Sequence, residues 1–144
     1  MATIDLESHF LAATEAAAIA AAAWRGKGDG KAADGAAVEA MRAIFDQVPF
    51  DGRVAIGEGE RDDAPMLWIG EPLGSMQGNP DVPSIDIAVD PLECTNHVAL
   101  DLPNAMAVLS LIHISEPTRL RRIWDGGVGV EKKSGGGGGG GGGG

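Results

Sequence analysis

The apolar residues in the first third of the chain recur at helical spacing. Alanine dominates residues 4–24, and Leu6 and Phe10 add larger apolar side chains, so this stretch predicts a helix. A second helix is expected over residues 36–47, with an apolar face along one side. The preceding Asp34 is of the residue type that caps a helix N-terminus, and the sequence places it at that position.

Shorter segments further along the chain have the composition of β-strands. The most regular is residues 85–89, in which Ile85, Ile87 and Val89 alternate with smaller or polar side chains. Pro91 is expected to end this strand, because proline has no N–H to donate to a ladder. Further strands are predicted at residues 53–56, 66–69 and 104–109, the last of them buried, and residues 70–83 read as a surface hairpin or loop.

Carboxylates follow two of these strands. Asp90 and Glu93 come at the end of the central strand, and Glu58 stands between two glycines after residues 53–56. Neighbouring carboxylates repel each other unless a cation lies between them, and oxygen ligands suit Mg²⁺ or Mn²⁺ better than zinc or copper. Either of these turns alone would be read as an acidic, solvated loop. Because two strands end in the same way, we favour a metal-assisted phosphate site.

Composition limits the possible partners. The chain has 144 residues, 11 Lys and Arg against 21 Asp and Glu, and a formal net charge of −10. Such an acidic surface argues against nucleic acid and anionic membranes, whereas bound divalent metal ions would let a phosphorylated small molecule approach. The single cysteine, Cys94, fits a reducing compartment. Neither a signal sequence nor a membrane-spanning apolar run is evident, so we expect a cytoplasmic protein.

A glycine-rich basic stretch, RGKGDGK, separates the two predicted helices at residues 25–31. It has two interpretations. Glycine-rich backbone with lysines can contact phosphate, and the same composition also makes a flexible connector. It is not a P-loop, because the Gly-Lys-Ser/Thr ending is missing.

Three motifs together resemble one known family. They are DGAAV at residues 34–38, GEGERDDAPML at residues 57–67 and DIAVDPLE at residues 86–93. In this order they are similar to class II fructose-1,6-bisphosphatases, a group that includes the bifunctional fructose-1,6-/sedoheptulose-1,7-bisphosphatases. The resemblance covers residues 1–109 as the N-terminal part of the family's metal-dependent sugar-bisphosphatase domain. It implies an α/β protein with a layered α/β/α/β/α sugar-phosphatase fold, of which only the N-terminal portion is present.

The resemblance also implies a reaction and a set of site residues. The reaction is metal-dependent hydrolysis of the 1-phosphate of fructose 1,6-bisphosphate to fructose 6-phosphate, a step of gluconeogenesis, with Mn²⁺ or Mg²⁺ as cofactor. Thr95 would help to position the attacking water, and full-length members are expected to be homo-oligomers. The resemblance assigns metal binding to Asp34, Glu58, Asp90 and Glu93, catalysis to Thr95 and Glu58, and substrate binding to Glu93, Cys94 and Thr95.

The chain departs from the family pattern in three places, one of which is His97, where the family more usually has an apolar residue. Cys94 stands where the family normally has glycine, and a side chain there would hinder the approach of the phosphate. A catalytic thiol is not favoured, because no paired histidine base is evident. After residue 109 the resemblance ends: residues 110–134 are expected to be a non-family tail of artefactual origin, similar to a translated sequencing adapter, and residues 135–144 a disordered polyglycine tail.

Three functional hypotheses follow. The first is the N-terminal part of a class II fructose-1,6-bisphosphatase, which we expect to be inactive and poorly folded as this chain alone. The second is another sugar-bisphosphate or inositol-phosphate phosphatase with the same metal centre. The third is a non-catalytic acidic metal-binding fragment or a chimeric product without function.

Overall fold

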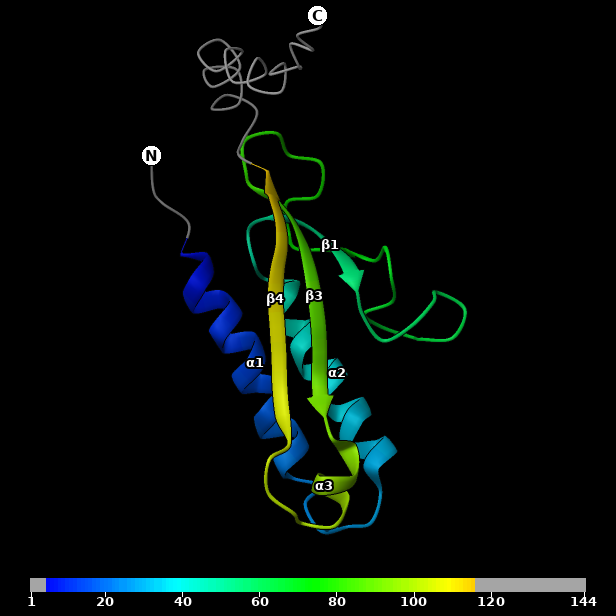
Figure 1. Ribbon diagram of the computed structural model, residues 1–144. Helices are drawn as coiled ribbons and strands as arrows, with labels where there is room; N and C mark the ends of the chain where they lie inside the picture. Colours follow the sequence, from blue (N-terminus) through cyan, green and yellow to red (C-terminus); the bar gives the residue numbers. More distant parts are fainter. Residues whose placement is uncertain (1–4, 116–144) are drawn as a thin grey trace, which may run out of the picture.

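In the computed structural model, residues 5–115 are described, and they form a mixed α/β domain with three helices and one four-stranded sheet (Figure 1). The α/β class predicted from the sequence is confirmed. Of the non-family tail expected at residues 110–134, residues 110–115 belong to a strand of the sheet, and the remainder lies outside the described part of the chain, as does the polyglycine tail expected at residues 135–144. The elements are α1 (Leu6–Ala22), α2 (Gly30–Phe45), β1 (Asp51–Ile56), β2 (Pro72–Leu73), β3 (Ser84–Glu93), α3 (Thr95–Ala99) and β4 (Met106–Ser115).

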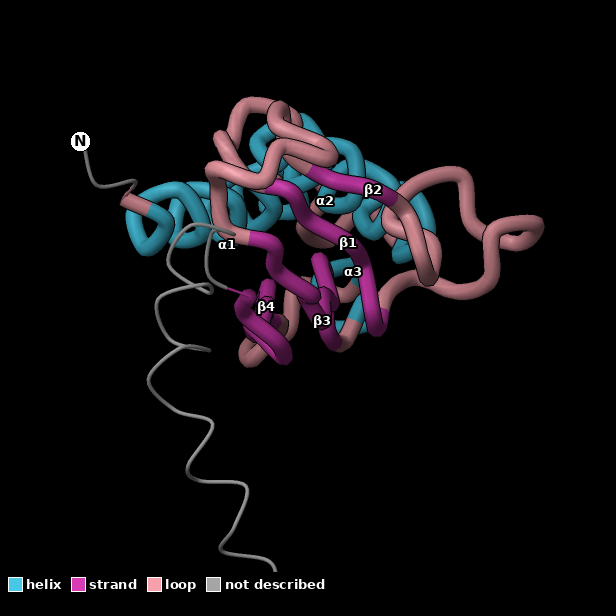
Figure 2. Tube along the Cα trace, turned by 90° about the horizontal axis from the view of Figure 1, so that it is seen from above, coloured by secondary structure: helices cyan, strands magenta, loops and turns pink. Residues whose placement is uncertain are grey.

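The sheet has the strand order β2-β1-β3-β4, and only β1 and β3 run parallel. The connection between them is long, as a parallel pair requires. Figure 2 shows α1 and α2 on the same side of the sheet, and in Figure 1 the short α3 lies at the end where β3 finishes. β1 ends beside Ala88 of β3, so the residues that follow β1 lie near the carboxyl-terminal part of β3, which runs on toward α3.

The core lies between the sheet and the two long helices. Ile85, Ile87 and Val89 of β3 are buried against this layer, as their alternation predicts. Fully burying side chains of this size stabilises the fold by about 1.5–3 kcal/mol each. Phe10 of α1 packs edge to face on Phe45, with ring centroids 6.2 Å apart. The small side chains on the buried face of α1 are Ala13, Ala17 and Ala21, which let α1 approach closely.

Helix α2 begins earlier than the sequence predicts. Its N-cap is Asp29, whose carboxylate accepts a hydrogen bond of 2.9 Å from the Ala32 N–H. Asp34 lies inside the helix, so its predicted role as the N-cap is wrong. The Asp-Gly pair at Asp34 and Gly35 resembles a turn, but a suitable cap four residues earlier starts the helix first. The Asp34 carboxylate is consequently not engaged in capping.

The strand predicted at residues 66–69 is also wrong. Leu67 has φ 55°, which is a left-handed conformation incompatible with a strand. This stretch is a loop, and the short strand β2 follows it at the edge of the sheet.

Strands β3 and β4 both run further than predicted. Pro91 does not end β3, because the register shifts between Asp90 and Glu93 and the irregularity accommodates the proline. β4 starts later, at Met106, and continues past residue 109 to Ser115. It is not buried as expected: Met106 is 55% exposed and Val108 is 42% exposed, because the described helices cover only the other face of the sheet.

No helix among residues 5–115 is long and apolar enough to cross a membrane.

The position of the α2 cap can be tested with two alanine variants. Asp29→Ala removes a side-chain cap and should lower the free energy of unfolding by about 1 kcal/mol in urea denaturation. Asp34→Ala should cause no such loss, because alanine favours the helix interior and the change removes a carboxylate from a like-charged group. Equal losses in the two variants would contradict the assignment of Asp29 as the cap.

Candidate metal centre

Carboxylates from three elements meet at the edge where β1 and β3 end. Asp34 comes from the second turn of α2, Glu58 from the turn that follows β1, and Asp90 from the last part of β3. The carboxyl groups of Asp34 and Glu58 share a hydrogen bond, and the charge of Asp90 acts on both of them. The structure thus brings Glu58, which follows β1, near Asp90 of β3, and α2 adds Asp34.

This grouping raises the pKa of the carboxyl groups. Burial, followed by the nearby charges of Asp34 and Asp90 and the hydrogen bond to Asp34, raises the pKa of Glu58 from 4.5 to about 7. Burial and the charge of Asp90 also raise the pKa of Asp34, although its hydrogen bond with Glu58 opposes this effect. Both side chains are half-buried and lose part of their hydration, and among residues 5–115 no salt bridge pairs either of them with a cation. The arrangement favours either a proton or a cation at this place.

Glu93 extends the group on its exposed side. A hydrogen bond with Asp90, and the charge of that residue, raise the pKa of Glu93. The four carboxyl groups predicted from the sequence thus fall into two neighbouring pairs, Asp34 with Glu58 and Asp90 with Glu93, and a hydrogen bond within either pair requires a proton on one of its carboxyl groups. The charge of Asp90 connects one pair to the other.

The donor chemistry of this group fits a hard divalent cation. All its donors are carboxylate oxygens, which Mg²⁺ and Mn²⁺ prefer. Within residues 5–115, however, no three His, Cys, Asp or Glu side chains stand close enough together to form a ready coordination shell. Asp34, Glu58, Asp90 and Glu93 would therefore hold a cation only after their side chains turn toward it.

Thr95 lies beside the same group, at the start of α3. A Cβ added to Gly30, the first residue of α2, would lie 3.4 Å from Thr95 Oγ1, so the two helix starts are in close contact. A shallow cavity of about 340 Å³ opens next to Thr95. Its lining consists of Asp90, Leu92, Glu93, Cys94, Thr95, Asn96 and His97. The cavity brings together the predicted substrate-binding residues and adds Asn96, which the sequence analysis did not single out.

Cys94 adopts a backbone conformation that glycine prefers. Its φ is 66° and its ψ is 58°, in the left-handed region, where a Cβ costs about 1–2 kcal/mol. The side chain is exposed. A glycine at this position, as the family normally has, would adopt the left-handed backbone without this cost, in addition to leaving room for a phosphate.

The glycine-rich stretch at residues 25–31 is tied to α3. The Gly26 N–H donates to the Val98 carbonyl at 2.8 Å, and the Gly28 N–H donates to the Ala99 carbonyl at 2.9 Å. These two amides are used within the fold, which supports the connector interpretation over phosphate contact by this backbone.

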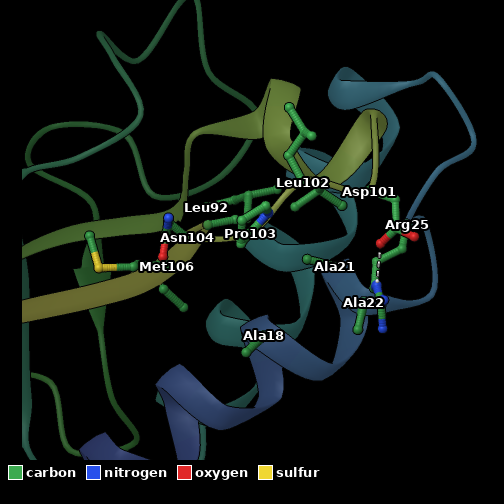
Figure 3. A pocket seen from close by; sticks show the side chains of 13 residues that line it. Ala18, Ala21, Ala22, Arg25, Leu92, Asp101, Leu102, Pro103, Asn104 and Met106 are labelled. Atoms are coloured by element: carbon green, nitrogen blue, oxygen red, sulfur yellow. Dashed lines mark hydrogen bonds and ion pairs between the residues drawn. The ribbon is translucent and has the colours of Figure 1, made fainter.

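A second cavity, of about 460 Å³, lies at the other side of α3 (Figure 3). Its floor is formed by small residues of α1, including Ala18 and Ala21, and an ion pair between Arg25 and Asp101 with a distance of 2.9 Å lies at its rim. None of the four clustered carboxylates lines this cavity, so it is distinct from the candidate metal centre.

Comparisons with known proteins agree with the motifs. The family model described as "Bacterial fructose-1,6-bisphosphatase, glpX-encoded" matches residues 4–120. Fructose-1,6-bisphosphatase 1 class 2 of Escherichia coli is 50% identical over 107 residues, which are 74% of this chain and 31% of that protein.

Two relatives carry bifunctional names. The D-fructose 1,6-bisphosphatase class 2/sedoheptulose 1,7-bisphosphatase of Trichormus variabilis is 50% identical over 117 residues, or 76% of this chain and 33% of that protein. Its namesake in a Synechococcus species is 54% identical over 106 residues, or 67% of this chain and 30% of that protein. The chain spans about a third of the length of these relatives.

The raised pKa of Glu58 predicts how stability depends on pH. A carboxyl whose pKa is raised on folding holds its proton more tightly in the folded state, so the stability it provides is full below pH 4.5 and is lost as pH rises through 7. In the presence of a chelator we expect unfolding free energy to fall by about 1–2 kcal/mol over this interval, since solvent screening reduces the full linkage value.

Urea denaturation at a series of pH values measures this loss, and Glu58→Gln is the control that should remove most of it. Saturating Mn²⁺ should also reverse the loss at pH 7, because a bound cation stabilises the ionised carboxylates. A stability that rises between pH 4.5 and 7 without metal would contradict the clustering of these groups.

Two variants of Cys94 separate the effect of the backbone from that of the thiol. Cys94→Gly removes the Cβ from a left-handed residue, whereas Cys94→Ala removes only the sulfur. We expect the glycine variant to be more stable than the alanine variant by about 0.5–1 kcal/mol, after allowing for the greater freedom of glycine in the unfolded chain. Equal stabilities in urea denaturation would show that the left-handed conformation carries no cost here.

Proposed function

Because the chain belongs to the glpX-encoded, class 2 family of bacterial fructose-1,6-bisphosphatases, we propose that it carries the divalent-metal part of a sugar-bisphosphatase site. The proposed reaction of the whole protein is hydrolysis of the 1-phosphate of fructose 1,6-bisphosphate, with Mn²⁺ or Mg²⁺ as cofactor. The observation that carries the proposal is the meeting of Asp34, Glu58 and Asp90 at the end of the parallel strand pair.

The residues of the chain have distinct proposed roles. Asp34, Glu58, Asp90 and Glu93 would hold the metal, which when bound neutralises phosphate charge and activates a water molecule. Thr95 would orient the attacking water with its hydroxyl group, from a position at the wall of the cavity that also contains Glu93. Glu58, whose pKa is raised to about 7 in the absence of a cation, would act both as a metal ligand and in catalysis.

We propose in addition that this domain is the first part of a layered α/β/α/β/α architecture. Ile56 of β1 and Val108 of β4 are 60% and 42% exposed, and they lie on strands whose other face packs against α1 and α2. An apolar sheet face is stable only when another layer covers it. The greater length of the relatives supplies enough chain for such a layer.

A second candidate substrate is sedoheptulose 1,7-bisphosphate. The names of the relatives in Trichormus variabilis and Synechococcus include this activity, and both substrates present a phosphate on a sugar. The same metal centre would serve either reaction, so the choice between them depends on residues that contact the sugar.

The enzymatic proposal can be tested in a chimera that supplies the rest of a family member. Residues 1–109 of this chain, with Cys94→Gly, would be joined to the remaining part of the Escherichia coli relative. We expect Mn²⁺-dependent release of phosphate from fructose 1,6-bisphosphate, and we expect Glu58→Gln to lower kcat/KM by about 100-fold or more through the loss of a metal ligand.

Glu60→Gln is the matched control for that variant. Glu60 lies in the same loop and is exposed, and its neutralisation changes net charge by the same amount, so activity should stay within about twofold of the parent, as for surface changes away from a site. If the chimera is folded and binds Mn²⁺ but releases no phosphate, the result contradicts the enzymatic proposal and supports the non-catalytic metal-binding hypothesis.

A further inference from the structure

Glu71 is the one charged residue whose side chain is buried among residues 5–115, with 6% of its surface exposed. It stands directly before β2, at the end of the loop that carries Glu58. Its Oε1 accepts a hydrogen bond of 2.8 Å from Arg42 Nε of α2, and its Oε2 accepts one from the Leu67 N–H. Both oxygens are therefore occupied by protein donors.

Leu67 connects Glu71 to the candidate metal centre. While its N–H donates to Glu71, its carbonyl oxygen accepts a hydrogen bond of 2.9 Å from the Glu58 N–H. Gly57 makes this approach possible, because a Cβ at that position would lie 2.1 Å from the Leu67 oxygen. Leu67 also has φ 55°, a conformation that costs energy for leucine and persists only where the surroundings impose it.

Helix α2 positions both members of the Asp34–Glu58 pair. Asp34 projects from α2 directly. Arg42 lies eight residues later on the same helix and donates a hydrogen bond to the Glu71 carboxylate. The same carboxylate accepts a hydrogen bond from the Leu67 N–H, and the Leu67 carbonyl accepts one from the Glu58 N–H. Helix α2 therefore positions Asp34 because this residue is part of the helix. It positions the backbone of Glu58 through three successive hydrogen bonds.

A purely stabilising role would not require a charged group here. Burying an ion pair has a large desolvation cost, and apolar residues of similar volume often stabilise a fold as well or better. Two directed hydrogen bonds accepted by one carboxylate do, however, define the position of a loop more closely than apolar contacts can. Hydrogen-bonding partners behind metal ligands commonly act in this way.

We propose that Glu71, held by Arg42, is a positioning residue that sets the backbone of Glu58 through Leu67 and so aims the Glu58 carboxylate at Asp34 and Asp90. This inference rests on the proposed metal-binding function. Glu71 itself touches neither metal nor substrate; it determines how well the two carboxylates are arranged before a cation binds.

The test compares Mn²⁺ binding in the full 144-residue chain and its variants. Glu71→Gln keeps the size of the side chain, but an amide has a single acceptor oxygen and cannot accept from both Arg42 and Leu67. We expect the Kd for Mn²⁺, measured by electron paramagnetic resonance of the free ion, to rise by about tenfold. Amide hydrogen exchange should show faster exchange of the Glu58 and Leu67 N–H groups, with α1 unchanged.

Asp101→Asn is the matched control. Asp101 is also a carboxylate paired with an arginine, at 2.9 Å from Arg25 Nε, but it is exposed and lines the other cavity. Its replacement by an amide should leave the Kd for Mn²⁺ within about twofold of the wild type, as for surface changes distant from a site. Asparagine also accepts the positive φ of 56° at this position.

The outcomes separate the two proposals. If the wild-type chain binds Mn²⁺ and Glu71→Gln binds it equally well, the positioning role is wrong while the metal centre stands. If the wild-type chain shows protected amides in α1 and α2 by hydrogen exchange and still binds no Mn²⁺, the metal centre is wrong and the positioning role fails with it. If Glu71→Gln does not fold, Arg42→Lys takes its place, because lysine keeps the charge but changes the hydrogen bond to Glu71, and the same two results decide.

Discussion

The parallel pairing of β1 with β3 is the constraint on which the rest of the structure depends. Parallel neighbours finish at the same edge of a sheet, so the carboxylates after β1 and at the end of β3 are brought together by the backbone itself. Repulsion among the carboxylates opposes this meeting: burial first, and then the charges of Asp34 and Asp90, raise the pKa of Glu58. The hydrophobic core formed by β3 and the two long helices holds the arrangement in place.

Helix α2 links this constraint to the proposed chemistry. Its cap at Asp29 sets where the helix begins, which places Asp34 on the side that faces the strand ends. Eight residues later Arg42 engages the buried Glu71, and the same helix thereby also fixes the loop of Glu58. Metal sites need ligands that are already close to their bound positions, because each ordering step weakens binding. The domain supplies part of this order, because one helix and one strand pair fix the backbone that carries Asp34, Glu58 and Asp90.

The sequence predicted much of this arrangement and failed where a single residue or a distant contact decides the local structure. Regular alternation predicted β3, and its carboxylates pointed to the site. The strand expected at residues 66–69 is absent because Leu67, whose N–H donates to Glu71, has a left-handed conformation. The local sequence pattern does not predict this conformation. Similarly, the Asp34–Gly35 pair resembled a turn, and only the competing cap at Asp29 shows that α2 starts earlier.

The central claim is that these carboxylates form one divalent-cation site, and the most direct measurement is paramagnetic broadening of amide NMR signals by a small amount of Mn²⁺. The account predicts that the amides of Asp34, Glu58, Asp90 and Glu93 broaden first and together. It also predicts that the exposed acidic turn of Asp62 and Asp63, at residues 61–63, broadens only at higher Mn²⁺. Broadening that begins at that turn, or that spreads evenly over all exposed carboxylates, would contradict the claim.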